Sequence, residues 1–252
     1  MGDAQKLAEA FGGSGSLEDL AARPATVEDA YAMQDEVRAL IGTSVIGWKL
    51  AQTTAKAQAA AGIIAPTVAP LLDGMIVPDG TVFGAGHFYQ PEGEAEIAIE
   101  LRRDIEGPAT RAEVADAAAG YRVAIEVADT RYTDKKSMGT PSVIADMNSS
   151  AALVIGPLEP LAGLDSIATS RIVLRLGDGT IVDTLPDDMR PDPLTVVQFL
   201  TEFLAERGEK LSAGMIITTG THTAPTRSEP GLLVAEYGDK TRLTARLSGP
   251  AA

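Results

Sequence analysis

Two glutamates separated by one residue offer the most direct chemistry in this sequence. Glu94 and Glu96 lie in a segment whose apolar residues alternate from Ala95 to Leu101. An alternation with period two is typical of a β-strand with one buried face, so both glutamates should project from the same side. Adjacent carboxylates repel each other unless a cation, a proton or solvent separates them, and their oxygens suit Mg²⁺, Mn²⁺ or Ca²⁺. The pair therefore predicts either a divalent metal site or a solvated acidic face on an edge strand.

A third carboxylate, Glu126, stands within the apolar segment Tyr121–Ala128. A charged side chain among Val, Ala and Ile residues is rarely buried unless it is paired or binds a metal. A strand that turns this side chain to water is the alternative. Together with Glu94 and Glu96, Glu126 favours a metal site with open positions for substrate and water, as catalytic metals require.

The elements that must position these residues follow from periodicity and turn signals. Before Asp73, apolar spacing predicts mainly helices, above all over Val27–Ile41, with a helical turn at Leu17–Ala22. A short apolar strand over Ser44–Leu50 interrupts them, and a proline-containing loop runs to about Leu72. After Asp73, short β-like runs alternate with turn signals.

This pattern predicts an α+β fold built on a mixed, mostly antiparallel β-roll or sandwich. We expect residues 1–75 to form a small helical N-terminal region and residues 76–252 to form a β-rich, metal-binding catalytic domain.

Composition limits the classes of function that remain open. The chain has 252 residues, a net charge of −14 and no cysteine. The negative charge argues against non-specific nucleic-acid binding and against binding to an anionic membrane surface. The absence of cysteine excludes disulfides, thiolate catalysis and zinc–sulfur sites. With neither a signal peptide nor a membrane span in the sequence, we expect a soluble cytoplasmic protein.

Several motifs together resemble the 2-keto-4-pentenoate hydratase / 4-oxalocrotonate decarboxylase family, part of the fumarylacetoacetate hydrolase superfamily. The resemblance runs from about Thr26 to the end of the chain, and it implies a β-roll of the fumarylacetoacetate hydrolase C-terminal-domain type. The motifs are Ile46-Gly-Trp-Lys49-Leu50, Glu94-Ala-Glu96, Ile125-Glu126-Val127-Ala-Asp129-Thr-Arg131, Ala145-Asp146 with Ser149-Ser150, and Ile216-Ile-Thr-Thr-Gly220.

The resemblance also implies a set of site residues. Mg²⁺ or Mn²⁺ would bind Glu94, Glu96 and Glu126 and chelate the 1-carboxylate and 2-oxo group of a small anionic 2-oxo or 2-hydroxy acid. The predicted catalytic residues are Lys49 and Asp73. The predicted substrate-binding residues are Arg131, Ser149, Thr219 and Thr221.

Several of these residues also have an alternative role that involves no substrate. Lys49 could be an exposed surface lysine, although its place between Trp48 and Leu50 favours burial, which lowers the pKa of a lysine. Thr219 and Thr221 could simply form a turn at a strand end. For Arg131, an ion pair with Asp129 or Asp134 is an equal alternative to substrate binding.

The sequence departs from the family at one segment near the site. Where the family has Asp-Asn-Ala-Ser-Ser-Gly, this chain has Asp146-Met-Asn-Ser-Ser-Ala151, so Met147 replaces the asparagine and Asn148 is shifted by one residue. Of the two histidines, His222 is the better functional candidate. His87 matters because hydrolases of the superfamily use a His/Glu dyad, but their Phe-x-Pro-x-Gly-Pro stretch is absent here, which counts against C–C hydrolysis.

The expected function is metal-dependent hydration of a 2-hydroxy-2,4-dienoate to a 4-hydroxy-2-oxoalkanoate, in the catabolism of aromatic compounds. The alternatives are decarboxylation of a 2-oxo-3-enedioate, hydrolysis of an acylpyruvate, and a non-catalytic partner subunit. We expect a homo-oligomer, and an association with a related decarboxylase is a further expectation from the family.

Overall fold

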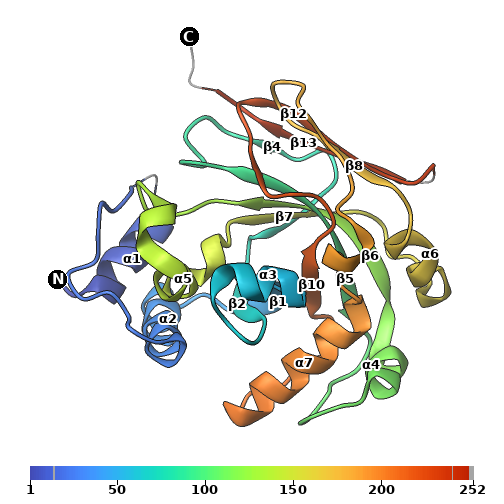
Figure 1. Ribbon diagram of the computed structural model, residues 1–252, viewed down its shortest axis with the longest axis horizontal. Coiled ribbons are helices and arrows are strands. Elements are labelled where there is room, and N and C mark those ends of the chain that lie inside the picture. Colours follow the sequence, from blue (N-terminus) through green and yellow to red (C-terminus); the bar gives the residue numbers. More distant parts are fainter. Residues whose placement is uncertain (14, 240, 250–252) are drawn as a thin grey trace.

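The computed structural model describes residues 1–13, 15–239 and 241–249 and contains two β-sheets with helices around the larger one (Figure 1). The larger, eight-stranded sheet has the order β2-β1-β10-β5-β6-β7-β3, with β11 also paired to β5. Its strands are β1 (Val45–Ala51), β2 (Thr67–Leu72), β3 (Ile76–Pro78), β5 (Glu92–Leu101), β6 (Ala118–Ala128), β7 (Ala152–Ile155), β10 (Ile216–Thr221) and β11 (Thr226–Arg227).

The smaller, five-stranded sheet has the order β4-β13-β12-β8-β9. Its strands are β4 (Val82–Phe83), β8 (Ile172–Arg175), β9 (Ile181–Val182), β12 (Gly231–Tyr237) and β13 (Thr241–Leu247). The helices are α1 (Asp3–Phe11), α2 (Val27–Ile41), α3 (Ala55–Ala61), α4 (Arg111–Ala117), α5 (Lys135–Ala145), α6 (Leu164–Ala168) and α7 (Pro193–Glu206), and the short 3₁₀ helices are η1 (Met147–Ser149), η2 (Leu161–Gly163) and η3 (Asp187–Met189).

The core lies between the two sheets. Apolar side chains from one face of β5 and β6, such as Ile97 and Ile125, belong to the same buried cluster as Leu174 of β8 and Leu233 of β12. Because side chains alternate along a strand, the even-numbered residues of β5 and β6 point away from this core. The glutamates therefore face the opposite side of the large sheet, where α3 and α5 lie (Figure 1).

The predicted fold class is confirmed. The ladders within the described ranges are mostly antiparallel, and the parallel pairs are β1–β10, β3–β7 and β4–β13. Helix α2 has the predicted bounds because Thr26 and Asp29 form a reciprocal capping box at its start and Gly42 adopts a left-handed conformation at its end.

Two local predictions are wrong. Leu17–Ala22 is not helical, and Leu17 instead forms a bridge with Tyr132. The segment expected to be a loop up to Leu72 contains strand β2, in which Pro70 pairs with Trp48. Proline is tolerated there because β2 is the edge strand of the sheet. No strand lies on its outer side, so no hydrogen bond to such a strand is lost with the missing N–H.

The expected division between residues 75 and 76 does not coincide with a structural boundary. Strands β1 and β2 precede it, yet they belong to the same sheet as β5 and β6, and β1 pairs in parallel with β10. A chain cut at that point would divide one sheet. No helix in the part of the chain that the structure describes combines the length and the apolarity needed to cross a lipid bilayer.

Candidate metal centre

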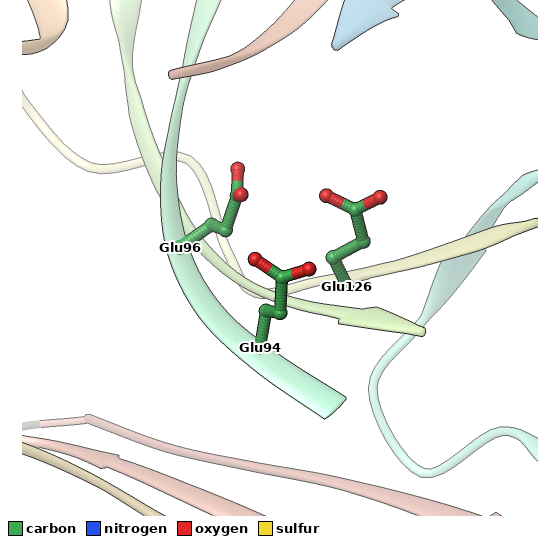
Figure 2. A group of neighbouring side chains, drawn as sticks. All are labelled: Glu94, Glu96 and Glu126. Carbon is green, nitrogen blue, oxygen red and sulfur yellow. The ribbon is translucent and has the colours of Figure 1, made fainter. Parts of the chain in front are cut away.

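Three glutamate side chains converge in one cavity of about 480 Å³, which we call the glutamate cavity. Glu94 and Glu96 project from β5, and Glu126 projects from β6 toward them (Figure 2). The antiparallel register places Glu94 directly opposite Glu126, so their side chains share one face of the sheet. One carboxylate oxygen from each glutamate lies within 4.8 Å of the others, a spacing that one cation can bridge.

Burying three carboxylates together in this cavity costs free energy unless a cation balances their charge. Glu96 and Glu126 are buried, with 2% and 3% of their surface exposed. Burial and the neighbouring Glu126 raise the pKa of Glu94 to about 8, and burial together with both neighbours raises the pKa of Glu96 well above its usual range. A cluster of buried oxygen donors with surplus negative charge fits a hard divalent ion such as Mg²⁺ or Mn²⁺.

The structure brings Lys49 into the same cavity. Strand β1 carries it, and the Nζ atom donates to the Glu126 carboxylate and, over 3.0 Å, to the backbone oxygen of Asn148. Close pairing of β1 with β10 depends on Gly47, since a Cβ there would lie 2.1 Å from the Ile216 carbonyl oxygen.

The charge state of Lys49 differs from the sequence-based expectation. Burial does lower its pKa, but the carboxylates of Glu126 and Glu94 outweigh this effect, and the pKa of Lys49 is raised above its ordinary value. The prediction that Lys49 is buried is confirmed, whereas the expected lowering of its pKa is not found beside these carboxylates. Beside these uncompensated carboxylates, the raised pKa keeps Lys49 as an ammonium group that can donate a proton or hold an anion.

A strained turn supplies two further polar groups to the cavity. Met147, Asn148 and Ser149 are consecutive residues with φ near +50°, a left-handed conformation that non-glycine residues rarely adopt. The Asn148 Nδ2 and Ser149 Oγ atoms are buried, line the cavity and have no partner among the described residues. Ser149 is among the predicted substrate-binding residues, whereas Asn148 is not. The shift of the asparagine by one residue, together with the tolerance of asparagine for left-handed backbone, is the sequence signal that could identify this turn.

Only one of the two predicted threonines belongs to the described lining of the glutamate cavity. Thr221 lines the glutamate cavity. Thr219 does not, because its Oγ1 donates to the Ile97 carbonyl oxygen over 2.7 Å. Between them, Gly220 has φ +100°, and a Cβ there would lie 2.2 Å from Thr53 Oγ1, so this close approach requires glycine.

Comparison with known proteins agrees with this geometry. Residues 45–250 match the family model described as fumarylacetoacetate (FAA) hydrolase C-terminal. The chain belongs to the fumarylacetoacetate hydrolase family.

Within the fumarylacetoacetate hydrolase family, the similar proteins include lyases of two kinds. The chain is 32% identical to a 4-oxalocrotonate decarboxylase of Pseudomonas putida, over 82% of this chain and 79% of that protein. It is 30% identical to 2-keto-4-pentenoate hydratase 1 of Dechloromonas aromatica strain RCB, over 77% and 74%. A solved structure of 4-oxalocrotonate decarboxylase from Pseudomonas putida G7, complexed with magnesium and adipate, has a TM-score of 0.82 at 27% identity and covers 97% of each chain.

Besides Thr219, two further predicted site residues of this fumarylacetoacetate hydrolase family member, Asp73 and Arg131, lie outside the described lining of the glutamate cavity. Asp73 is exposed in the turn between β2 and β3 and does not reach the cavity. Arg131 is buried and donates from Nε to Asp146 Oδ1 over 2.5 Å and from Nη1 to the Ser150 carbonyl oxygen over 2.8 Å. Its ion-pair partner is therefore Asp146 rather than Asp129 or Asp134, and it lines a separate cavity.

The histidines also lie elsewhere. His87 packs against the rings of Phe83 and Phe88 and lines the separate cavity that contains Arg131. His222 is fully buried beside the strand β5 backbone, where its backbone N–H donates to the Ala95 carbonyl oxygen over 2.8 Å. Neither histidine belongs to the described lining of the glutamate cavity.

His222 should make the stability of the fold depend on pH. Burial, with Arg190 nearby, lowers its pKa from 6.5 to about 4. The unfolded chain therefore binds a proton at His222 more readily than the folded chain does. As pH falls from 6.5 to 4, this difference should lower the free energy of unfolding by about 3 kcal/mol. Urea unfolding of wild type and of His222→Leu, at pH 7 and pH 4, measures this: the loss should be about 3 kcal/mol smaller in the variant. Equal losses in both proteins would contradict the prediction.

Proposed function

We propose that this chain is a divalent-metal-dependent lyase that adds water to a 2-hydroxy-2,4-dienoate to give a 4-hydroxy-2-oxoalkanoate. The observation that carries the proposal is the convergence of three glutamates and the Lys49 ammonium in one cavity. The hydratases and decarboxylases among the relatives support a lyase reaction, and the neighbouring decarboxylase structure holds magnesium.

The residues present fit a metal-assisted reaction. Glu94, Glu96 and Glu126 would hold Mg²⁺ or Mn²⁺. When bound, such an ion supplies a Lewis acid for the 1-carboxylate and 2-oxo oxygens of the substrate. The carboxylates, held on the paired strands β5 and β6, would fix the position of that charge, so little reorganisation would be needed during the reaction.

The remaining polar groups act on the substrate itself. Lys49 is buried with a raised pKa, so its ammonium can first hold the negative charge of the dienolate and then deliver a proton to the far carbon, which leaves a neutral amine. Asn148 Nδ2 and Ser149 Oγ are free to donate to the substrate carboxylate or enolate oxygen. Their strained turn holds these donors in position before the substrate enters.

Decarboxylation is the second candidate, because relatives at similar identity bear the name 4-oxalocrotonate decarboxylase and the reaction would use the same enolate. Hydrolysis of an acylpyruvate has less support, since neither His87 nor His222 belongs to the described lining of the cavity. A non-catalytic partner subunit has less support as well, because the three glutamates and Lys49 are all in place.

Product analysis separates these reactions. The metal-loaded protein is incubated with 2-hydroxypenta-2,4-dienoate and, separately, with 2-oxohex-3-enedioate, and the products are followed by NMR. We expect a new C4 hydroxyl signal from the dienoate. Loss of CO₂ from the enedioate alone would assign the decarboxylase, and no change in either substrate would contradict a lyase function.

A cytoplasmic homo-oligomer remains part of the proposal. Large apolar side chains at Ile64 and Val82 are 99% and 62% exposed, which suits a contact with a second chain.

A further inference from the structure

One wall of the glutamate cavity is apolar. This wall is formed by Ala57 and Ala61 of α3, Val143 of α5, Leu185 just before η3, and Met189 at the end of η3. Small and aliphatic side chains from three separate elements are therefore available to contact the part of a substrate beyond its reacting end. A cavity of about 480 Å³ lies within the range of about 300–1,000 Å³ that holds ligands of moderate size, so it leaves room for a tail.

The charges of the described lining leave no cation for a second carboxylate. The lining contains four carboxylates, those of Glu92, Glu94, Glu96 and Glu126, and two ammonium groups, those of Lys49 and Lys135. Each ammonium already contacts a carboxylate, Lys49 that of Glu126 and Lys135 that of Glu92. One divalent ion would bring this lining to neutrality, with no positive charge in excess.

The nearest rim residues do not change this balance. Lys56 at the start of α3 contacts Asp188 of η3, and both side chains are exposed. This pair joins two of the elements that carry the apolar wall, but neither residue belongs to the lining. A carboxylate at the end of a substrate tail would thus lose its hydration against Ala, Val, Leu and Met side chains without gaining a free cationic partner in the described lining.

We infer that the substrate is a monocarboxylate whose tail is uncharged and apolar, rather than a dicarboxylate. The inference rests on the proposed function, because it assumes that the 2-oxo acid end binds at the glutamates. A monocarboxylate substrate would distinguish this chain from those relatives that are named for a dicarboxylate substrate. It also favours hydration over decarboxylation, since a substrate that loses CO₂ and keeps its 1-carboxylate must begin with a second one.

A matched pair of probes tests the tail directly by calorimetry on the Mg²⁺- or Mn²⁺-loaded protein. 2-Oxohexanoate and 2-oxoadipate share the same 2-oxo acid end and differ in whether the tail ends in a methyl group or a carboxylate. We expect 2-oxohexanoate to bind about tenfold more tightly or better. 2-Oxooctanoate should bind more tightly still, by about threefold for each added methylene that enters the cavity.

A charged variant of the wall provides the second measurement. Met189→Arg places a cation beside the tail and should shift the preference toward 2-oxoadipate by about tenfold or more, whereas the matched uncharged variant Met189→Gln should leave the wild-type order in place. Equal or tighter binding of 2-oxoadipate by wild type would overturn the inference. The same preference in Met189→Arg as in wild type would overturn it too, because the wall would then not contact the tail. If the protein binds the metal but none of the three 2-oxo acids, the proposed function itself fails, and the inference fails with it.

Discussion

Replacing Glu94 by glutamine should weaken Mg²⁺ or Mn²⁺ binding by about 100-fold or more while the chain remains folded. Loss of a supporting group next to a metal site already costs about 10–100-fold in affinity, and loss of a direct ligand should cost at least as much. Glutamine keeps the size of the side chain and removes its charge, so the β5–β6 register need not change. Isothermal titration calorimetry of wild type and Glu94→Gln gives the ratio of dissociation constants.

Glu92→Gln is the matched control for this prediction. Glu92 lies on the same strand and face and lines the same cavity, but it pairs with Lys135 and is not one of the three clustered glutamates. Its replacement should change metal affinity by less than about tenfold. Comparable losses in Glu92→Gln and Glu94→Gln would show that general negative charge, rather than a defined ligand set, attracts the ion.

Thermal unfolding without metal adds an independent measurement for Glu94. Its pKa is raised from 4.5 to about 8, so ionising it destabilises the folded, metal-free protein as pH rises between these values. Glu94→Gln should therefore unfold at a higher temperature than wild type at pH 8 in the absence of metal. Added Mg²⁺ should stabilise wild type and leave the variant nearly unchanged. A metal-free variant that is markedly less stable than wild type would contradict the repulsion argument.

The glutamate cluster was accessible from the sequence because strand alternation encodes it. The apolar residues of β5 that alternate from Ala95 fix which side chains face the core, and this places Glu94 and Glu96 together on the other face. The helix over Val27–Ile41 was accessible for a similar reason, since its first and last residues carry local capping signals. Such features depend on neighbours in sequence.

Features that depend on distant segments were not accessible. Pro70 indicates a loop locally, and only the position of β2 at the sheet edge makes a strand possible. Arg131 is paired with Asp146 through a tertiary contact, so its type and spacing could not show that it is absent from the cavity. Asp73 lies in a turn whose direction is set by β2 and β3, and this turn leaves it exposed.

The turn at Met147–Ser149 could be predicted only in part. The departure from the family pattern was visible in the sequence, and an extended segment would have placed Asn148 on the opposite face. Three consecutive left-handed residues instead direct Asn148 and Ser149 into the cavity. The surrounding structure must stabilise this conformation, because each such residue costs about 1–3 kcal/mol.

Replacing Lys49 by methionine should lower turnover on the true substrate by about 10²–10⁴-fold, the range typical of a positioned acid–base group. The structure gives the physical reason. Lys49 is buried with a raised pKa and contacts Glu126, so its ammonium proton can be transferred only to a group bound inside the cavity. Methionine keeps the unbranched shape of the side chain and removes the ammonium. Steady-state kinetics with saturating metal measure the change, which should appear in kcat more than in KM.

Metal affinity distinguishes a role on the substrate from a role at the metal. An ammonium cannot coordinate a cation, and Lys49 competes for the Glu126 carboxylate, so Lys49→Met should bind Mg²⁺ at least as tightly as wild type. Lys135→Met is the matched control, because Lys135 also lines the cavity but pairs with Glu92, and its loss should lower turnover by less than about tenfold. Full activity in Lys49→Met, or a loss of activity that is restored by excess metal, would remove Lys49 from the proton-transfer step. Activity that falls while metal binding holds would assign the step to the Lys49 ammonium, since the cavity would then contain its metal and lack only the proton.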